Sequence, residues 1–367
     1  MRRESLSAFS WLILALAFFC LFPMAMAQTA PAISADQSQA ANMVIYPAPP
    51  AGFDPTTASD IALEVYGFPP RPDPTTAPQA HAHWRRLVSA PQARISNPLL
   101  RQTEIYHGPA RILSESPATV DNAKASSSYN WSGFAVVAAK GTFEVNNNYV
   151  FAEFVVPVAQ QAFGTCDGTW WYGSQWVGFD GYGSSDVLQA GTEADAFCSS
   201  GVTSTSYAAW IEWSPYAETQ IANFPVGPGD LMGVEVWYTT ASPYGHAYLV
   251  NYTTQETASV AFNPPSGTTF SGNSAEWVVE RPTVSSAYAN LTNYVADQFN
   301  IDEAYVPTGS MYYYPGTASS AAATVYNIKM ICPPWSPASS CSATTTISAP
   351  IRYGTYTLWF YNSAPSY

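Results

Sequence analysis

From Tyr129 onward the chain alternates between short runs of aromatic and β-branched residues and short stretches rich in Gly, Ser, Asn and Pro. No long stretch has the 3.6-residue period of a helix, and no repeat with propeller spacing is present. The runs predicted to be strands are residues 149–158, 174–181, 206–215, 231–240, 247–254, 275–280, 323–330 and 356–362. About 240 residues with this many short strands and turn signals predict a single all-β domain, a sandwich or a barrel.

The first 27 residues have a different pattern. A charged start, "MRRES", precedes an apolar run from Leu6 to Phe22, and the small-residue sequence "AMA" precedes Gln28. This order is typical of a secretory signal peptide, so the chain is expected to be secreted, to the extracellular space or the periplasm. A membrane anchor is the weaker alternative, because the apolar run is short for a spanning helix.

Residues 28–125 are rich in Pro and Ala and carry most of the basic residues. The domain that follows, residues 126–367, has seventeen Asp and Glu residues between Glu144 and Glu303 but few Lys or Arg. This division predicts a basic, partly disordered prosegment that binds an acidic surface and is released by acid. The alternative is a disordered linker that makes no contact with the domain. Within it, "HAHWRRLVSA" places Trp84, Leu87 and Val88 on one face of a short docking helix. The acidic domain excludes nucleic acid as a partner.

Four cysteines remain after the predicted signal peptide: Cys166, Cys198, Cys332 and Cys341. An even number in a secreted chain predicts two disulfides. Of the three possible pairings, closeness in sequence favours Cys166 with Cys198 and Cys332 with Cys341. A zinc site is disfavoured, because CxxC is absent and His246 is the only histidine beyond residue 107.

The residue types of the domain restrict the catalytic chemistry that it can perform. His246, in a predicted turn, is the one imidazole available to a serine or cysteine nucleophile, which makes both kinds of protease weak hypotheses. The Asp-Thr-Gly and Asp-Ser-Gly sequences of pepsin-like enzymes do not occur. Carboxylates and amides on strands remain as the candidate catalytic groups.

Alternation along four predicted strands places several of these groups on shared faces. Residues two apart point the same way, so each strand has one apolar face suited to a core and one face with acids, amides and tryptophans. The second faces hold Trp176, Gly178 and Asp180; Gln189, Gly191, Glu193 and Asp195; Trp210, Glu212 and Ser214; and Glu276, Val278 and Glu280. This composition indicates a groove rather than a solvated surface.

Seven short motifs in this region resemble those of the glutamic peptidases of the eqolisin type. They occur in the family's order and at roughly its spacing, and they cover about residues 126–285. They are "NWSGFAV" (130–136), "FVVP" (154–157), "WVGFDG" (176–181), "VLQAG" (187–191), "WIEWSP" (210–215), "GD" (229–230) and "AEWVVERP" (275–282).

The resemblance implies an antiparallel β-sandwich similar to the concanavalin or jelly-roll fold, with the active site on a concave face. It places the catalytic glutamine on Gln189 and the catalytic glutamate on Glu276. Residues beside the site correspond to Trp176, Asp180, Glu193 and Glu212. Trp176 and Trp210 are expected to form walls that exclude water and bind substrate side chains. At Glu193 the family commonly has aspartate. A glutamate can act as a general base on water, and a glutamine amide can stabilise the oxyanion.

The sequence therefore predicts a secreted, acid-acting endopeptidase that is made as a zymogen. We expect a monomer without cofactor or metal that acts on polypeptides and uses its own prosegment as an intramolecular inhibitor. A glycoside hydrolase is the rival enzyme, because sandwich folds often place paired carboxylates and tryptophans in a cleft. A carbohydrate-binding module is the non-enzymatic alternative, supported by the 12 Trp and 24 Tyr residues.

Overall fold

The computed structural model describes residues 43–89, 93–120, 122–317, 319–320, 322–332 and 345–362. The predicted signal peptide lies outside these residues, and so does Cys341. All described residues belong to one unit, residues 33–367. None of the helices in this part of the chain is long and apolar enough to span a membrane.

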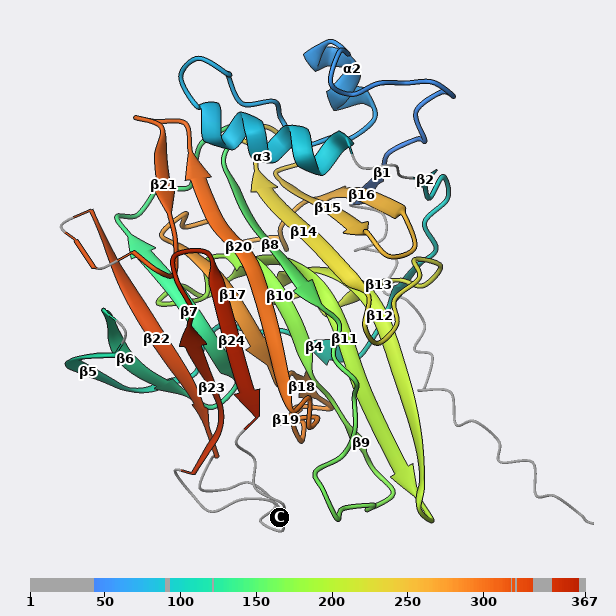
Figure 1. Cartoon of the computed structure of the whole chain (residues 1–367), viewed down its shortest axis with the longest axis vertical. Coiled ribbons are helices and arrows are strands. Elements are labelled where there is room, and N and C mark those ends of the chain that lie inside the picture. The colour runs from blue at the N-terminus through green and yellow to red at the C-terminus, as the bar shows by residue number, and fades with distance from the viewer. Residues whose placement is uncertain are drawn as a thin grey trace, which may run out of the picture. The chain divides into compact units, whose positions relative to one another are not determined.

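The domain is an antiparallel β-sandwich, as predicted, and its two layers face each other in Figure 1. The front layer contains the strands with the candidate catalytic residues, and each strand pairs with the next one across the sheet. It runs β13 (Thr219–Ile221), β12 (Val202–Ser214), β11 (Val187–Ser199), β10 (Ser174–Phe179), β17 (Ser274–Glu280), β7 (Trp131–Ala138) and β22 (Ala323–Ile331). Short β9 (Trp170–Trp171) pairs with β11.

The back layer is built in the same way from strands that lie elsewhere in the sequence. It runs β16 (Glu256–Phe262), β15 (Gly245–Asn251), β14 (Leu231–Tyr238), β8 (Tyr149–Val155), β20 (Ala296–Val306), β24 (Thr357–Asn362) and β23 (Thr346–Arg352), with β21 (Met311–Tyr313) paired to β20. Strand β23 also pairs with β22 and so joins the two layers at one side. The C-terminal segment therefore completes both sheets and is not a separate flap.

The core lies between the layers and is formed by the apolar faces predicted from alternation. Val177, Leu188, Ile211 and Trp277 all belong to this buried cluster. Large β-branched and aromatic residues at every second position favour the strand conformation and fill the space between the sheets. The residues between them point to the opposite side of the front layer, which carries the site.

The segment that precedes the predicted catalytic domain is folded onto the sandwich over its described residues. It contains α2 (Asp60–Val65), α3 (Pro78–Ser89), β1 (Met43–Ile45), β2 (Ala93–Arg94), β3 (Leu100–Gln102), β4 (Ile105–Tyr106), β5 (Ile112–Val120) and β6 (Ala123–Ser128). Helix α3 confirms the predicted docking helix, with Trp84, Leu87 and Val88 all buried. A small third sheet joins β4 to β18 (Thr283–Val284) and β19 (Ala287–Tyr288).

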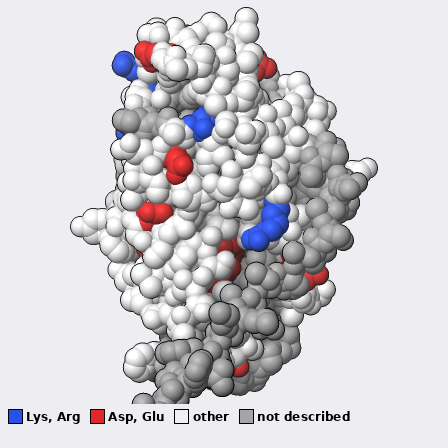
Figure 2. Space-filling model, turned by 90° about the vertical axis from the view of Figure 1, so that its right-hand side faces the viewer, with Lys and Arg blue, Asp and Glu red and all other residues white. Residues whose placement is uncertain are grey.

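The acidic residues are largely inside the protein. Of the seventeen Asp and Glu residues between 144 and 303, all in the described part, thirteen are buried. The face shown in Figure 2 accordingly carries only scattered charges. Seven of these acids are buried beneath the preceding segment itself. Glu153, Glu235 and Glu303 contact α3, and Glu193, Glu212, Glu218 and Glu280 contact His107, so the segment covers an acidic face of the sandwich. Among the ion pairs of the described residues, Arg86–Glu153 is the one that joins an arginine of this segment to an acid of the sandwich, and the other cross-contacts use histidines.

The Cys166–Cys198 disulfide is present, as predicted, and it closes the end of the long β11–β12 hairpin onto the preceding loop. Cys332 is buried and disulfide-bonded. Its predicted partner, Cys341, lies outside the described residues.

Candidate active site

Strand register brings the predicted catalytic residues to one face of the front layer. Gly178 of β10 pairs with Gln189 of β11 on one side and with Glu276 of β17 on the other. Four residues earlier on β10, Ser174 pairs with Glu193 and Glu280. Side chains two and four residues apart share a face, so all four polar groups point the same way. Gln189 and Glu276 are two strands apart, which corresponds to about 10 Å between their backbones.

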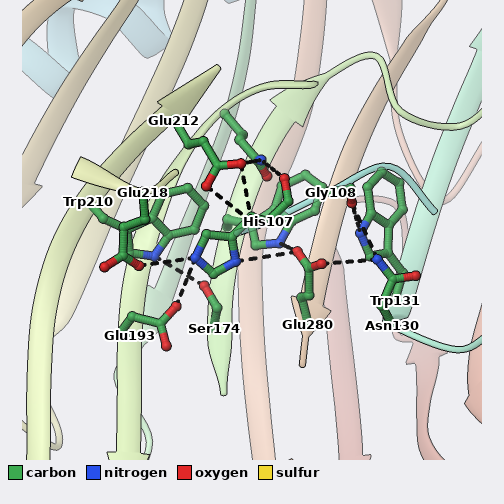
Figure 3. A network of polar contacts seen from close by, with 12 residues as sticks. His107, Gly108, Asn130, Trp131, Ser174, Glu193, Trp210, Glu212, Glu218 and Glu280 are labelled. Atoms are coloured by element: carbon green, nitrogen blue, oxygen red, sulfur yellow. Dashed lines mark hydrogen bonds and ion pairs between the residues drawn. The ribbon is translucent and has the colours of Figure 1, made fainter. Parts of the chain in front are cut away.

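His107 occupies the centre of this face (Figure 3). Its Nε2 lies 3.0 Å from Oε1 of Glu193 and 3.1 Å from Oε2 of Glu218, and its Nδ1 lies 3.5 Å from Oε2 of Glu280. The ring stacks on Trp210, with centroids 4.0 Å apart and planes 8° apart. The side chain is fully buried. A residue of the predicted prosegment therefore contacts three acids and a tryptophan of the site.

The backbone of His107 binds the same face as its side chain. Its N–H donates to both carboxylate oxygens of Glu212, at 3.1 and 3.0 Å, and its carbonyl oxygen accepts a hydrogen bond from Nε2 of Gln189 at 2.5 Å. Gln189 and Glu212 are direct neighbours across β11 and β12. The two peptide groups that flank the Cα of His107 thus make the contacts expected of a bound substrate backbone. We call residues 105–111 the plug.

Glu280 is held from three directions, by two hydrogen bonds and one ion pair. Trp176 donates from Nε1 to its Oε2 at 2.9 Å, and Asn130 donates from Nδ2 to its Oε1 at 3.0 Å. The third is the imidazole of His107. Asn130 also donates to the carbonyl oxygens of Gly108 and Pro109 in the plug. Two side chains of the "NWSGFAV" and "WVGFDG" motifs therefore help to fix the orientation of the Glu280 carboxyl group.

Glu276 belongs to a different group of side chains. Both of its carboxylate oxygens are buried without a hydrogen-bond partner among the described residues, and burial raises its pKa, with the negative charges of Asp180 and Asp186 adding to the rise. Neither His107 nor Gln189 contacts it among the described hydrogen bonds and ion pairs. The structure thus places Glu276 on the predicted face but outside the network around the plug, whereas Glu280 is part of that network.

Asp180, predicted to lie beside the substrate, binds the backbone of a neighbouring loop. Its carboxylate accepts hydrogen bonds from the backbone N–H groups of Ser271, Gly272 and Asn273, at 2.7, 2.9 and 2.9 Å. Burial and the negative charge of Asp186 raise its pKa to about 7, against the lowering effect of these donors. The other residues predicted to bind substrate all lie around the plug: Trp176, Glu193, Trp210 and Glu212.

Burial dominates the electrostatics of the network. It raises the pKa of Glu212, Glu218 and Glu280, and in each case contacts with His107 lower the pKa in opposition. Burial alone would lower the pKa of His107, but its hydrogen bonds to the surrounding glutamates outweigh this and raise it well above 6.5. The glutamates thus favour the protonated form of the His107 imidazole, while burial favours the protonated form of the carboxyl groups around it.

His107, Glu193 and Glu218 could also hold a divalent metal, because their ligand atoms all lie within 4.8 Å of one another. The single Nε2–H group forms a hydrogen bond with Glu218 at 3.1 Å, and Glu193 lies 3.0 Å from the same nitrogen as an ion pair without a hydrogen bond. No step is assigned to an ion.

Sequence reasoning missed His107, Glu218, Asn130 and Trp131 as site residues. Trp131 donates from Nε1 to the carbonyl oxygen of Gly108 at 3.0 Å. The signal for Asn130 and Trp131 was their position in the first family motif. His107 lies in a segment assigned to the prosegment, and Glu218 lies in a turn, so neither carried a strand pattern.

Comparison with known protein families identifies the class of this chain. Residues 129–349 match the model of the Peptidase A4 family. Aspergillopepsin-2 from Aspergillus niger is 30% identical over 168 residues, which is 42% of this chain and 56% of that protein. The chain thus spans little more than half the length of this relative.

Two solved structures are similar at lower identity. Scytalido-glutamic peptidase with a peptide-based transition-state analogue has 21% identity and a TM-score of 0.46, covering 64% of this chain and 98% of that one. Aspergilloglutamic peptidase from Aspergillus niger has 22% identity and a TM-score of 0.39, covering 52% and 99%.

The chain therefore belongs to the Peptidase A4 family, the eqolisin-type glutamic peptidases that its motifs resemble. This membership favours a peptidase over the glycoside hydrolase and carbohydrate-binding alternatives.

Proposed function

We propose that this chain is the precursor of a secreted, acid-acting endopeptidase in which Gln189 and Glu280 act on a water molecule and the plug inhibits the site until maturation. The supporting observation is the way the two groups meet on His107. Gln189 donates to its carbonyl oxygen, and Glu280 lies beside its imidazole. The plug thus lies between an amide donor and a carboxyl group that come from strands on opposite sides of β10.

Glu280 takes the role that the family resemblance assigned to Glu276. Both side chains point to the same face, but Glu280 is the one that shares a contact partner with Gln189. Its carboxyl group is oriented by Trp176 and Asn130, and burial raises its pKa, which favours its role as the proton donor to the leaving amine.

The proposed reaction begins after the plug has left, with a water molecule in the space that the His107 ring occupies in the precursor. Glu280, as carboxylate, takes a proton from the water while the oxygen attacks the scissile carbonyl carbon. Gln189 donates a hydrogen bond to the developing oxyanion, as it donates to the His107 carbonyl in the precursor. Glu280 then gives the proton to the leaving amine as the C–N bond breaks. Glu212, which binds the N–H of His107, positions the substrate backbone.

The same geometry supports inhibition by the prosegment. The imidazole of His107 fills the space that the attacking water needs and holds the carboxyl groups toward itself. Its neighbour Gly108 is fixed through Asn130 and Trp131, which keeps the plug from moving along the face. Substrate can bind only when residues 105–111 leave.

Three variants test the assignment with denatured casein at about pH 3.5, where ordinary carboxyl groups are largely protonated. Glu280→Gln and Gln189→Ala are expected to lower turnover by about a thousandfold or more, the scale of losing a catalytic base or an oxyanion donor. Glu276→Gln is the matched control and is expected to keep at least about a tenth of the activity. If Glu276→Gln is inactive and Glu280→Gln is active, the roles are reversed. If all three are active, the proposed mechanism is wrong.

A further inference from the structure

The outer face of the back layer is covered by residues 43–89, which we call the cover. Side chains of α2, α3 and the connecting loop pack against aromatic side chains that point away from the sandwich core. Figure 1 shows both helices together at the top of the view. The cluster consists of Leu63, Phe68, Ala77, Ala80, Trp84, Leu87 and Val88 from the cover, with Tyr149, Phe151, Trp237, Tyr248, Val250 and Tyr305 from the sandwich.

The side chains of this face are largely aromatic and apolar, unlike those of a face exposed to water. Phe151 is fully buried, and Trp237, Tyr248 and Val250 are buried to nearly the same extent. Outer faces of sandwich strands are ordinarily polar. Loss of the cover would therefore expose one contiguous aromatic patch, of the kind that makes a soluble protein associate or aggregate.

Three polar side chains of α3 each contact one acid of the back layer. His83 Nε2 lies 2.8 Å from Oε2 of Glu235 in β14, with both side chains buried, and Arg86 lies 2.8 Å from Glu153 in β8. Gln79 donates to Glu303 in β20 at 2.5 Å. Without His83, Glu235 would be a buried carboxyl group without this partner, which is a costly state.

Backbone pairing and one arginine extend the contact to the edge of the sheet. Strand β1 adds to the edge of β16, where Met43, Val44 and Ile45 pair with residues 260–262. Just past the cover, the Arg94 guanidinium lies 5.0 Å from the ring of Phe68 and 5.1 Å from that of Tyr248. The added strand protects the edge from pairing with other chains.

The plug and the cover are held by different forces. Carboxyl groups dominate the polar contacts of the plug, so its binding depends on their charge and on that of His107. The cover has charged contacts with the sandwich through His83 and Arg86, while most of its contact is apolar. Apolar burial does not depend on the charge of carboxyl groups.

We propose that the cover stays bound to the sandwich after the plug has left, so that the active enzyme consists of two polypeptides, the cover and the sandwich chain. The inference goes beyond the proposed function, because it assigns to half of the predicted prosegment a permanent structural role. The chain is cut between the cover and the plug, and the aromatic face is never exposed.

A cleavable precursor tests this without using the enzyme's own activity. The recognition sequence of a site-specific protease is inserted between Ser96 and Asn97, both exposed, and the purified chain is cut and passed over a sizing column at about pH 7 and about pH 3.5. The cover fragment is expected to elute with the sandwich in a one-to-one ratio at both values, measured by intact mass. Separate elution of the fragment, with a sandwich of unchanged melting temperature, overturns the proposal.

Paired substitutions locate the contact. Leu87→Ala and Leu63→Ala remove buried side chains of the cover and are expected to lower the retained fraction about tenfold or more. Ile61→Ala, in the same helix as Leu63 but 76% exposed, is the matched control and should retain the fragment fully. Equal retention in all three variants contradicts the proposed surface. Should the leucine variants fail to fold, the elution of the cut chain without substitutions still decides the question.

Discussion

The imidazole of His107 lies flat against the indole of Trp210 while its Nε2 faces Glu193 and Glu218. This placement of a titratable ring between an aromatic face and two carboxyl groups makes the plug sensitive to proton concentration. Hydrogen bonds to the glutamates raise the pKa of His107 well above 6.5 against the effect of burial, and contacts with His107 oppose the burial that raises the pKa of Glu218 and Glu280.

The first prediction concerns the pH dependence of inhibition. The pKa of His107 is raised in the bound state, so its contribution to binding is fully present below 6.5 and is lost as pH rises above this value. A synthetic peptide of residues 98–113 should therefore inhibit the mature enzyme more strongly at about pH 6 than at about pH 8. The His107→Ala peptide should bind about a hundredfold more weakly, the scale of losing charge-assisted hydrogen bonds, with a flatter pH profile. A Glu104→Ala peptide, changed at an exposed position, is the control, and equal profiles for all three peptides would refute the role of His107.

The second prediction isolates the hydrogen bond from Trp176 to Glu280. Trp176→Phe keeps an aromatic ring but removes the donor at 2.9 Å, so the pKa of Glu280 should rise further. We expect kcat/KM to fall about tenfold or more, with the acidic limb of its pH profile shifted to higher pH. Trp210→Phe is the comparison, because its indole donates to Ser174 rather than to Glu280. If the acidic limb shifts more in Trp210→Phe than in Trp176→Phe, the hydrogen bond from Trp176 does not set the pKa of Glu280.

The third prediction concerns Asp297, which is buried in β20 away from the site. Burial raises its pKa from 3.8 to about 8, although the N–H of Gln298 lowers it. Between these values the folded protein binds a proton that the unfolded chain does not, so stability decreases as pH rises through this window. Asp297→Asn removes this dependence, and its melting temperature should exceed that of the wild type at pH 7 by more than at pH 4. The exposed Glu144→Gln variant should show no such difference, and a constant offset for Asp297→Asn would contradict the argument.

The fourth prediction uses Gly178, which separates Gln189 from Glu276 on the front sheet. A Cβ at this position would lie 2.7 Å from the carbonyl oxygen of Leu188 and 2.9 Å from Cβ of Gln189. Gly178→Ala should therefore displace Gln189 and lower kcat strongly, with a stability loss of about 1–3 kcal/mol from overpacking. Gly227→Ala, where the nearest atom is 3.8 Å away, serves as the control for a small added side chain. Retention of full activity by Gly178→Ala would show that Gln189 tolerates the shift.

Local patterns in the sequence predicted much of this protein. Alternation assigned Gln189, Glu212, Glu276 and Glu280 to one side of their strands and Leu188, Ile211 and Trp277 to the core, and the structure confirms this division. The helix over residues 78–89 and the Cys166–Cys198 pair were also predictable. In each case the signal depends on neighbours close in sequence, because the direction of a side chain is fixed by the local backbone.

The choice between Glu276 and Glu280 required the tertiary structure. Both point to the same face, and only the pairing of β17 with β10, together with the course of the plug, shows which one shares a partner with Gln189. The burial of thirteen acids also could not be predicted, because a sequence gives the number of charged residues but not which of them lie inside the folded protein. His107 reaches the site from a segment more than eighty residues before Gln189. Alternation is a property of the single strand and can be read from the sequence, whereas register, depth and the approach of a distant segment result from long-range packing, which only the folded chain determines.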